Sequence, residues 1–128
     1  MSKKKFNVTI FFFFFFGVLD LFETVQAENF NLDLLMIDDT GCPYCQLWDE
    51  EIGYMYSKSE EGKLAPLIRH QYGEKLPEEI ILLSEPVYTP TFILLQNSEE
   101  RFRIEGYSGE EFFWSFLSEY ILQIKNEK

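Results

Sequence analysis

The chain has 128 residues, of which 22 are acidic and 11 basic, giving a formal net charge of −11 at neutral pH. Such an acidic balance argues against nucleic acid or an anionic membrane surface as a partner. It fits a solvated surface that aids solubility, and it does not by itself identify the partner. The length limits the chain to one compact domain.

Residues 1–27 have the pattern of a secretory signal peptide. The segment begins with three lysines, residues 3–5, and continues through an apolar stretch with six consecutive phenylalanines. It ends in a cleavage site of small residues, Val25-Gln26-Ala27. A single-span anchor is the alternative. However, Asp20 and Glu23 interrupt the apolar run before it reaches the roughly 18 to 20 residues that a spanning helix needs. We therefore expect an exported protein whose mature domain, residues 28–128, carries 20 acidic and 8 basic side chains.

Residues 32–37 form a nearly continuous apolar run, which is typical of a strand buried on both faces. This strand leads to Cys42 and Cys45, the only two cysteines of the chain. If a helix begins at Pro43, Cys42 occupies its N-cap, where free backbone N–H groups and the helix dipole favour a thiolate. Cys45 then lies one turn further along the same side. The spacing predicts that Cys42 attacks a disulfide and that Cys45 resolves the mixed disulfide.

Three other interpretations of the cysteine pair stay open. A zinc site would need two further ligands, and the chain has only His70 to offer beyond the pair. A purely structural disulfide would close so short a loop that it would stabilise little. The third interpretation is that the two cysteines have no chemical role at all. Met36 and Met55 form no recognisable metal motif. We expect a redox-active pair, with no metal and no cofactor.

The helix that follows the cysteines is expected to run from Pro43 to about Ile52 and to end at Gly53. Ser57 and Glu60 have the spacing of a capping box, which predicts a short second helix ending near Leu64. The expected inward side chains of the first helix are Leu47, Trp48 and Ile52.

Residues 67–72 are a weaker strand candidate, interrupted by Arg69 and His70. We interpret His70 as a partly exposed strand residue and not as a proton shuttle for the thiols. Residues 73–83 read as a connector with one helical turn after Pro77.

The C-terminal part predicts a hairpin and a closing helix. Residues 92–95 form an apolar strand, Asn97 and Ser98 a turn, and residues 101–104 a half-exposed edge strand. From Gly109 onward, apolar side chains recur at helical spacing. They are Phe112, Phe113, Trp114, Phe116, Leu117, Tyr120, Ile121 and Ile124.

Thr89-Pro90-Thr91 leads directly into the first strand of this hairpin. A proline at a strand entrance removes no interior ladder bond, and a cis bond here would form a locked turn. The order of strand, cysteine helix, strand, Thr-Pro, hairpin and last helix resembles the thioredoxin-like oxidoreductases. The resemblance implies an α/β fold with a compact β-α-β-β-β-α core and a central mixed sheet flanked by helices. It also implies a Cys42–Cys45 disulfide in the oxidised state, with Thr89 and Pro90 binding the substrate backbone.

More closely, the chain resembles the small periplasmic thioredoxin-like proteins of bacterial sulfur-oxidation (Sox) systems. The resemblance is carried by five segments, residues 42–48, 50–53, 59–67, 89–92 and 105–114. It implies a periplasmic protein, expected to be a monomer, that keeps partner-protein thiols reduced. Its electrons would come from a membrane donor of the DsbD type.

The chain also departs from thioredoxins. Gly41 replaces the tryptophan before the first cysteine, and Met36 occupies the position of the buried carboxylate. Asp38 or Asp39 could act as the base for Cys45 instead, although a strand-end carboxylate is more often a solvated turn former.

Between the cysteines, Pro43 and Tyr44 are the positions expected to tune the redox potential, and the same dipeptide occurs in many glutaredoxins. The alternative of a glutathione-linked protein is weakened by the acidic surface, because glutathione itself is an anion.

The direction of electron flow is not settled by these residues, because a disulfide-forming oxidase would share all of them. Acidic side chains near Cys42 would disfavour its thiolate and hence favour a reductase. They are Asp38, Asp39, Asp49, Glu50 and Glu51. A thiol-independent binding module on the same scaffold is a further alternative, with Tyr44, Tyr88 and Tyr107 as a docking surface.

Overall fold

The computed structural model describes residues 31–127. The predicted signal peptide, residues 1–27, lies outside these residues, so its presence and cleavage stay predictions. Within the described residues, no helix has the length and apolar character needed to cross a membrane.

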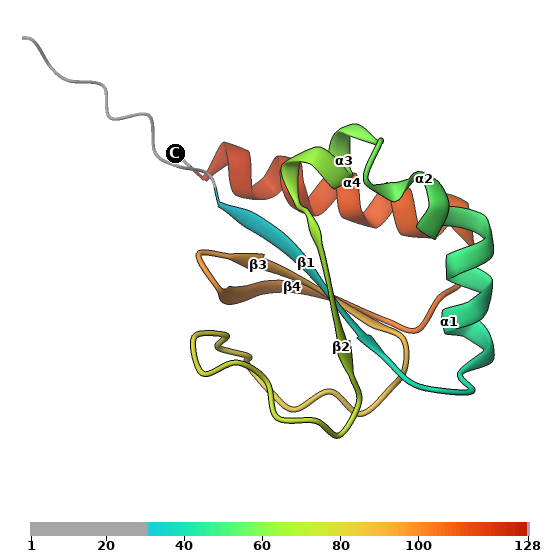
Figure 1. Ribbon diagram of the computed structural model, residues 1–128. Coiled ribbons are helices and arrows are strands. Elements are labelled where there is room, and N and C mark those ends of the chain that lie inside the picture. Colours follow the sequence, from blue (N-terminus) through green and yellow to red (C-terminus); the bar gives the residue numbers. More distant parts are fainter. Residues whose placement is uncertain (1–30, 128) are drawn as a thin grey trace, which may run out of the picture.

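Four strands form one mixed sheet in the order β2-β1-β3-β4 (Figure 1). They are β1 (Leu32–Asp38), β2 (Leu67–Gln71), β3 (Thr91–Gln96) and β4 (Glu99–Glu105). β2 runs parallel to β1, whereas β3 is antiparallel to both β1 and β4. The parallel pair needs a crossover, which the cysteine helix begins. The predicted element order and the central mixed sheet are thereby confirmed.

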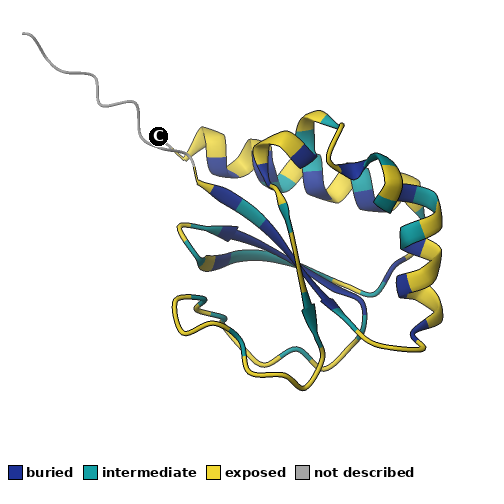
Figure 2. Ribbon diagram, in the orientation of Figure 1, coloured by how far each residue is buried: buried dark blue, intermediate teal, exposed yellow. Residues whose placement is uncertain are grey.

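The central strand β1 is buried on both faces, as its continuous apolar sequence predicted. Leu34 and Met36 point into the larger core beneath the helices, while Leu35 and Ile37 belong to a smaller cluster on the opposite face. Figure 2 shows this buried centre, with exposed residues concentrated on the outer sides of the helices and in the loops. β1 therefore fixes the position of whatever follows its last residue.

The helical elements lie on one side of the sheet (Figure 1). α1 (Pro43–Trp48) continues through a π-helical stretch, η1 (Asp49–Gly53), into α2 (Tyr54–Tyr56). A short α3 (Glu60–Leu64) follows, and α4 (Glu110–Asn126) closes the chain. α4 packs on the core through four buried residues, Phe113, Leu117, Ile121 and Ile124.

Several details differ from the sequence expectations. Gly53 does not end the helix, because it has helical dihedral angles. Its missing Cβ avoids tight contacts with Asp49 Oδ1 at 3.0 Å and with Trp48 Cζ3 at 3.3 Å. The cap of α3 is Ser59, not Ser57, and its hydroxyl accepts a hydrogen bond from the Gly62 N–H. Three side chains that were expected to face inward are exposed by more than a third. They are Leu47, Phe112 and Phe116.

The Asn97-Ser98 turn and the edge position of β4 agree with the prediction. Both turn residues have positive φ angles, 52° and 67°, and together they connect β3 to β4 as a two-residue hairpin loop. β4 is the last strand of the sheet on the β3 side, and an isolated parallel bridge joins its Glu99 to Ile81, in the segment between β2 and β3.

Residues 72–90, here called the β2–β3 loop, cover the other face of the sheet. Leu76, Ile80 and Leu82 pack onto the smaller apolar cluster. Glu100, whose side chain is only 4% exposed, holds the loop to β4: it accepts a hydrogen bond from the Leu83 N–H at 2.8 Å and pairs with Arg103 at 2.8 Å. Arg103 in turn donates to the Ser84 carbonyl. The path of the chain toward Thr89 thus depends on a buried ion pair.

We predict that Glu100→Gln lowers the free energy of unfolding by about 3 kcal/mol, because it leaves the largely buried Arg103 without its main partner. Urea denaturation of the purified domain measures this loss. The matched control is Glu99→Gln on the exposed neighbour, which should change stability by less than about 0.5 kcal/mol. Equal effects of the two changes would contradict the role given to Glu100.

Candidate active site

Cys42 occupies the N-cap of α1, as predicted. Its backbone is extended, Pro43 is the first helical residue, and the Cys42 Sγ accepts a hydrogen bond from the Cys45 N–H at 3.1 Å. Gly41, immediately before it, has a φ of +80°, a left-handed conformation that favours glycine over a bulkier residue. The glycine that replaces the thioredoxin tryptophan is therefore required by the turn that delivers Cys42 to the helix.

Cys42 and Cys45 are joined by a disulfide, with their Cα atoms 5.3 Å apart. Both residues are buried, but Cys42 is 7% exposed and Cys45 2%. Cys42, at the start of the helix, is thus the more exposed residue of the two, and both residues border the larger core. This arrangement suits an outer attacking thiol and an inner resolving thiol.

Trp48 anchors the cysteine helix to the rest of the domain. It is fully buried, and its ring lies 5.3 Å from Phe92 on β3 and 5.7 Å from Phe113 on α4, measured between ring centroids. Tyr56, at the end of the same helical segment, lies 6.0 Å from it. The expectation that Trp48 is a core residue is confirmed.

The Thr-Pro segment lies at the end of the sheet where the chain turns toward Cys42. Thr91 pairs with Ile37 in the register of β3 and β1, so Pro90 comes next to the last residue of β1. The Thr89-Pro90 peptide bond is cis, and Pro90 is buried. The Pro90 carbonyl accepts a hydrogen bond from the Gly106 N–H at 2.7 Å, which ties this segment to the end of β4.

The residue between Pro43 and Cys45 is the most exposed large side chain of the cysteine motif. Tyr44 is 58% exposed, and Tyr88, just before Thr89, is equally exposed. Both are available to a docking partner. Tyr107, which was grouped with them as a docking residue, is not: it is only 6% exposed and packs against Phe113.

Tyr107 instead connects the cysteine helix to the loop before α4. Its hydroxyl donates a hydrogen bond to Glu51 in η1. Desolvation by burial, together with this bond to Glu51, raises the pKa of Tyr107 above its ordinary range, so it remains a hydroxyl donor. No sequence pattern signals this contact, because the two residues are distant in the chain and meet only in the folded domain.

An ion cluster lies at the carboxyl end of β1. Arg69 on β2 binds Asp49 through two guanidinium hydrogen bonds, of 2.6 and 3.0 Å, and also binds Asp38. The hydrogen bonds to Asp49 and Asp38 raise the pKa of Arg69 further above its ordinary range. Asp38 therefore makes an ion pair that was not expected, besides accepting a local hydrogen bond from the Asp39 N–H at 2.8 Å, whereas Asp39 is exposed and accepts a bond from Gln71.

His70 is half-buried on β2, and its Nε2 donates a hydrogen bond to the Glu74 carbonyl at 3.0 Å. This bond directs the ring into the β2–β3 loop. Among residues 31–127, no group of three or more histidine, cysteine or carboxylate side chains is arranged to hold a metal ion.

Comparison with known proteins identifies the family. The crystal structure of the reduced periplasmic thioredoxin SoxS from Paracoccus pantotrophus matches with 42% sequence identity and a TM-score of 0.72, over 73% of this chain and 99% of that one. The chain belongs to the SoxS-type thioredoxins. With its Cys42–Cys45 disulfide, it is a thiol-disulfide oxidoreductase.

A second solved structure, a thioredoxin from Malassezia sympodialis, shares 14% identity with a TM-score of 0.47, over 70% of this chain and 77% of that one. No protein-family model matches the chain, and no curated protein matches it either. The family assignment therefore rests on the SoxS match.

We predict different outcomes for the two cysteine variants. Cys45→Ser should form a stable mixed disulfide through Cys42 with a disulfide-containing peptide, because the inner thiol that would release it is missing. Cys42→Ser should lose turnover and trap far less peptide. Mass spectrometry of the adducts measures both. Trapping through Cys45 in Cys42→Ser at an equal rate would contradict the assignment of the outer sulfur as the attacker.

Proposed function

We propose that this protein is an exported reductase that keeps thiols of partner proteins reduced, in a sulfur-oxidation pathway. The observation that carries the proposal is 42% identity to a periplasmic SoxS thioredoxin over 99% of its length. The signal-peptide pattern of residues 1–27 supports export to the periplasm. The electrons come from a membrane donor of the DsbD type, and the protein works as a monomer.

The reaction is a two-electron exchange between dithiol and disulfide. The Cys42 thiolate attacks one sulfur of the partner's disulfide, forms a mixed disulfide and releases the other partner sulfur as a thiolate that takes up a proton. The Cys45 thiolate then attacks the Cys42 sulfur. This step releases the second partner thiol and closes the Cys42–Cys45 disulfide, so the partner is reduced and this protein is oxidised.

The partner's backbone binds across Thr89, whose position next to the cysteine loop is given by the pairing of Thr91 with Ile37. Pro90 shapes this edge, and the buried Pro90 carbonyl is already bonded to Gly106. Tyr44 supplies an exposed ring beside the attacking sulfur. Pro43 sets the start of the helix and, with Tyr44, tunes the potential.

The electrostatics around the cysteines favour the reducing direction. Asp39, three residues before Cys42, is exposed, and a single guanidinium, that of Arg69, is shared between Asp38 and Asp49. The remaining negative charge opposes the N-terminal dipole of the helix, which stabilises the Cys42 thiolate. Weakening the thiolate destabilises the reduced protein, so it gives up electrons more readily.

The direction can be tested by running both half-reactions. The reduced mature domain should reduce a disulfide-bonded protein at least tenfold faster than the oxidised domain forms disulfides in a reduced, unfolded one. The rate of reduction is measured as the appearance of thiols in the disulfide-bonded protein. The rate of oxidation is measured, with the same thiol reagent, as the loss of thiols from the reduced protein. The opposite ratio would replace the reductase by a disulfide-forming oxidase, and an unchanged rate in Cys42→Ser would indicate a thiol-independent module.

We predict that Arg69→Gln makes the reduction potential of the cysteine pair more negative by about 5 to 20 mV, because it removes a positive charge near the cysteine helix. This corresponds to the roughly 0.2 to 1 kcal/mol of an exposed ion pair. Without Arg69, the negative charges of Asp38, at the end of β1, and of Asp49, at the end of α1, are uncompensated. Equilibration with thiol buffers measures the shift.

The matched control for Arg69→Gln is Lys63→Gln, which also removes a cation from an exposed pair, with Glu60, on α3. It should leave the potential within error of the wild type. A shift of Arg69→Gln toward less negative values would contradict the account of the direction.

A further inference from the structure

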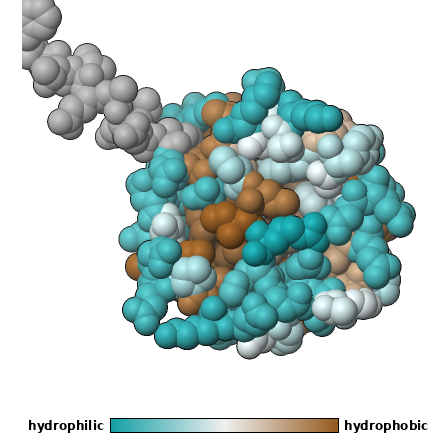
Figure 3. Space-filling view, viewed as in Figure 1, coloured by the Kyte–Doolittle hydropathy of each residue, from teal (hydrophilic) through white to brown (hydrophobic). Residues whose placement is uncertain are grey.

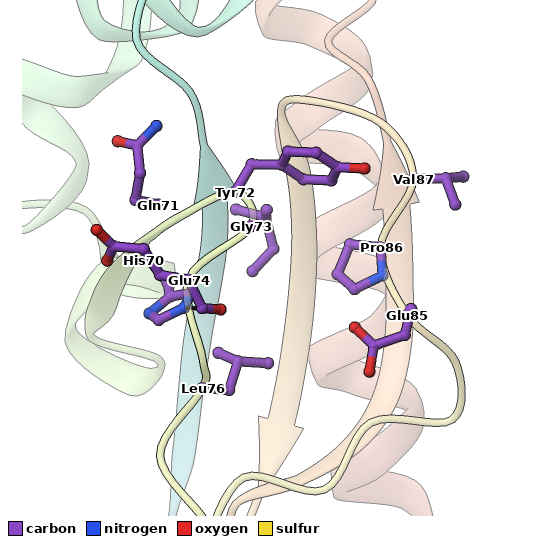
Figure 4. Close-up of a pocket in the computed structure, with 10 residues that line it drawn as sticks. His70, Gln71, Tyr72, Gly73, Glu74, Leu76, Glu85, Pro86 and Val87 are labelled. Carbon is purple, nitrogen blue, oxygen red and sulfur yellow. Dashed lines mark hydrogen bonds between the residues drawn. The ribbon is translucent and has the colours of Figure 1, made fainter.

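A hollow of about 320 Å³ lies between β2 and the returning part of the β2–β3 loop. Figure 4 shows its two sides: Tyr72 and Leu76 come from the start of the loop, and Glu85, Pro86 and Val87 from the part that returns toward β3. Its size is at the lower end of ligand pockets, sufficient for one long side chain.

The hollow is connected to the redox site on both sides. On one side, the Tyr72 N–H donates to the Asp38 carbonyl at 2.7 Å and the Gln71 side chain donates to Asp39 at 2.9 Å. The Asp39 carbonyl in turn accepts a hydrogen bond from the Cys42 N–H at 3.2 Å. These bonds hold the start of the loop against the turn that carries the attacking cysteine.

On the other side, Val87 lies two residues before Thr89, a distance of at most roughly 7 Å along the chain. Val87 is 63% exposed and Tyr88 58%. A partner polypeptide that binds in an extended form along Thr89 would therefore pass over Tyr88 and Val87. It would reach the hollow within a few residues of the partner's own reactive cysteine.

The lining combines apolar walls with negative charge. Ile37, Leu76 and Pro86 supply aliphatic surface, and Glu74 and Glu85 are the acidic members. No lysine or arginine lines it, and the His70 Nε2–H is already bonded to the Glu74 carbonyl. Figure 4 shows the Glu85 side chain extending into the space between the two parts of the loop. A lysine or arginine side chain has an aliphatic stem and a cationic end. The stem would pack against the aliphatic walls, and the cationic end would meet the carboxylate.

A neighbouring hollow of about 560 Å³ along the loop also combines apolar walls with acidic side chains. It shares Glu74, Leu76 and Glu85 with the first and adds Glu78. Its one cation, Lys75, is paired with Glu78 at 3.1 Å. Glu85 thus lies between two hollows, with no cationic partner among the ion pairs found in residues 31–127.

We propose that this hollow binds a lysine or arginine side chain of the partner protein, located within a few residues of the partner's reactive cysteine. The aliphatic stem packs on Leu76 and Pro86, and the cationic end binds the Glu85 carboxylate. The proposal rests on the oxidoreductase activity toward protein substrates and adds a specificity determinant to it. Selection is by charge, because an uncharged side chain of the same length would fill the walls but leave Glu85 solvated.

The test uses synthetic peptides with one cysteine capped as a mixed disulfide with 5-thio-2-nitrobenzoate. Lysine is placed at each of the three positions on either side of the cysteine, and each lysine peptide has a norleucine counterpart. The reduced protein transfers two electrons to the mixed disulfide and releases the coloured thiol. The ratio of kcat/KM for lysine over norleucine peptides is then measured for wild type, Glu85→Gln and Glu79→Gln.

Wild type should prefer lysine about two- to fivefold at one or two positions, the range of an exposed charge pair. Glu85→Gln should bring that ratio close to one. Glu79→Gln removes the same charge from the same loop at an exposed residue outside both hollows, and should keep the preference. If the preference for lysine falls equally in both variants, it arises from the general acidity of the surface and not from Glu85. That result would overturn the proposal.

A second arm separates this inference from the proposed function. If wild type reduces the peptides but shows no lysine preference at any position, the hollow is not a specificity pocket and the oxidoreductase function stands. If it reduces neither the peptides nor the free symmetrical nitrobenzoate disulfide, the function itself fails, and the specificity pocket fails with it.

Discussion

The burial of Trp48 is the constraint on which the redox site depends. Its ring fills the space between β3 and α4, in contact distance of Phe92 and Phe113, and it lies three residues beyond Cys45 on the same helix. Burial of an aromatic ring of this size fixes both the depth and the rotation of the helix. Cys45 is therefore held inside, while Cys42 stays at the N-cap, where the chain leaves β1. Gly53, whose missing Cβ leaves room for the indole, allows the helix to continue past it.

The sheet brings three sources of chemistry to one corner of this small domain. β1 ends in Asp38 and leads to the cysteines, β2 contributes Arg69, and β3 begins directly after Pro90. Figure 3 shows the face over the β2 edge, where apolar side chains reach the surface within a largely hydrophilic surround. Ile68 on β2 is among the exposed apolar residues. A partner that covers the β2 edge meets this apolar surface, and the charged groups at the end of β1 lie further along the same pair of strands.

Much of this could be predicted from the sequence, because the decisive signals are local. The apolar run of β1, the proline after Cys42 and the Asn97-Ser98 turn each specify the backbone over a few residues, and the structure agrees with them. The errors arose where packing between distant segments decides the outcome. Leu47 is exposed, although helical spacing assigned it to the inward face. Gly53 was expected to end the helix, but it lies within the helix, where its missing Cβ leaves room for the Trp48 ring. The ion cluster of Arg69 depends on the register of β2 against β1, and the loop anchor of Glu100 on a contact with Leu83; neither has a sequence signature.

The reduction potential of the Cys42–Cys45 pair in the mature domain tests the central claim most directly. It can be measured by equilibrating the purified protein with thiol buffers of known potential. We predict a value near that of thioredoxin, about −270 mV, because the exposed Asp39 carboxylate, three residues before Cys42 and outside the Arg69 ion pairs, disfavours the Cys42 thiolate. A value near −120 mV would mean that the reduced dithiol is strongly stabilised. The protein would then be a disulfide-forming oxidase, and the electrostatic argument for a reductase would be wrong.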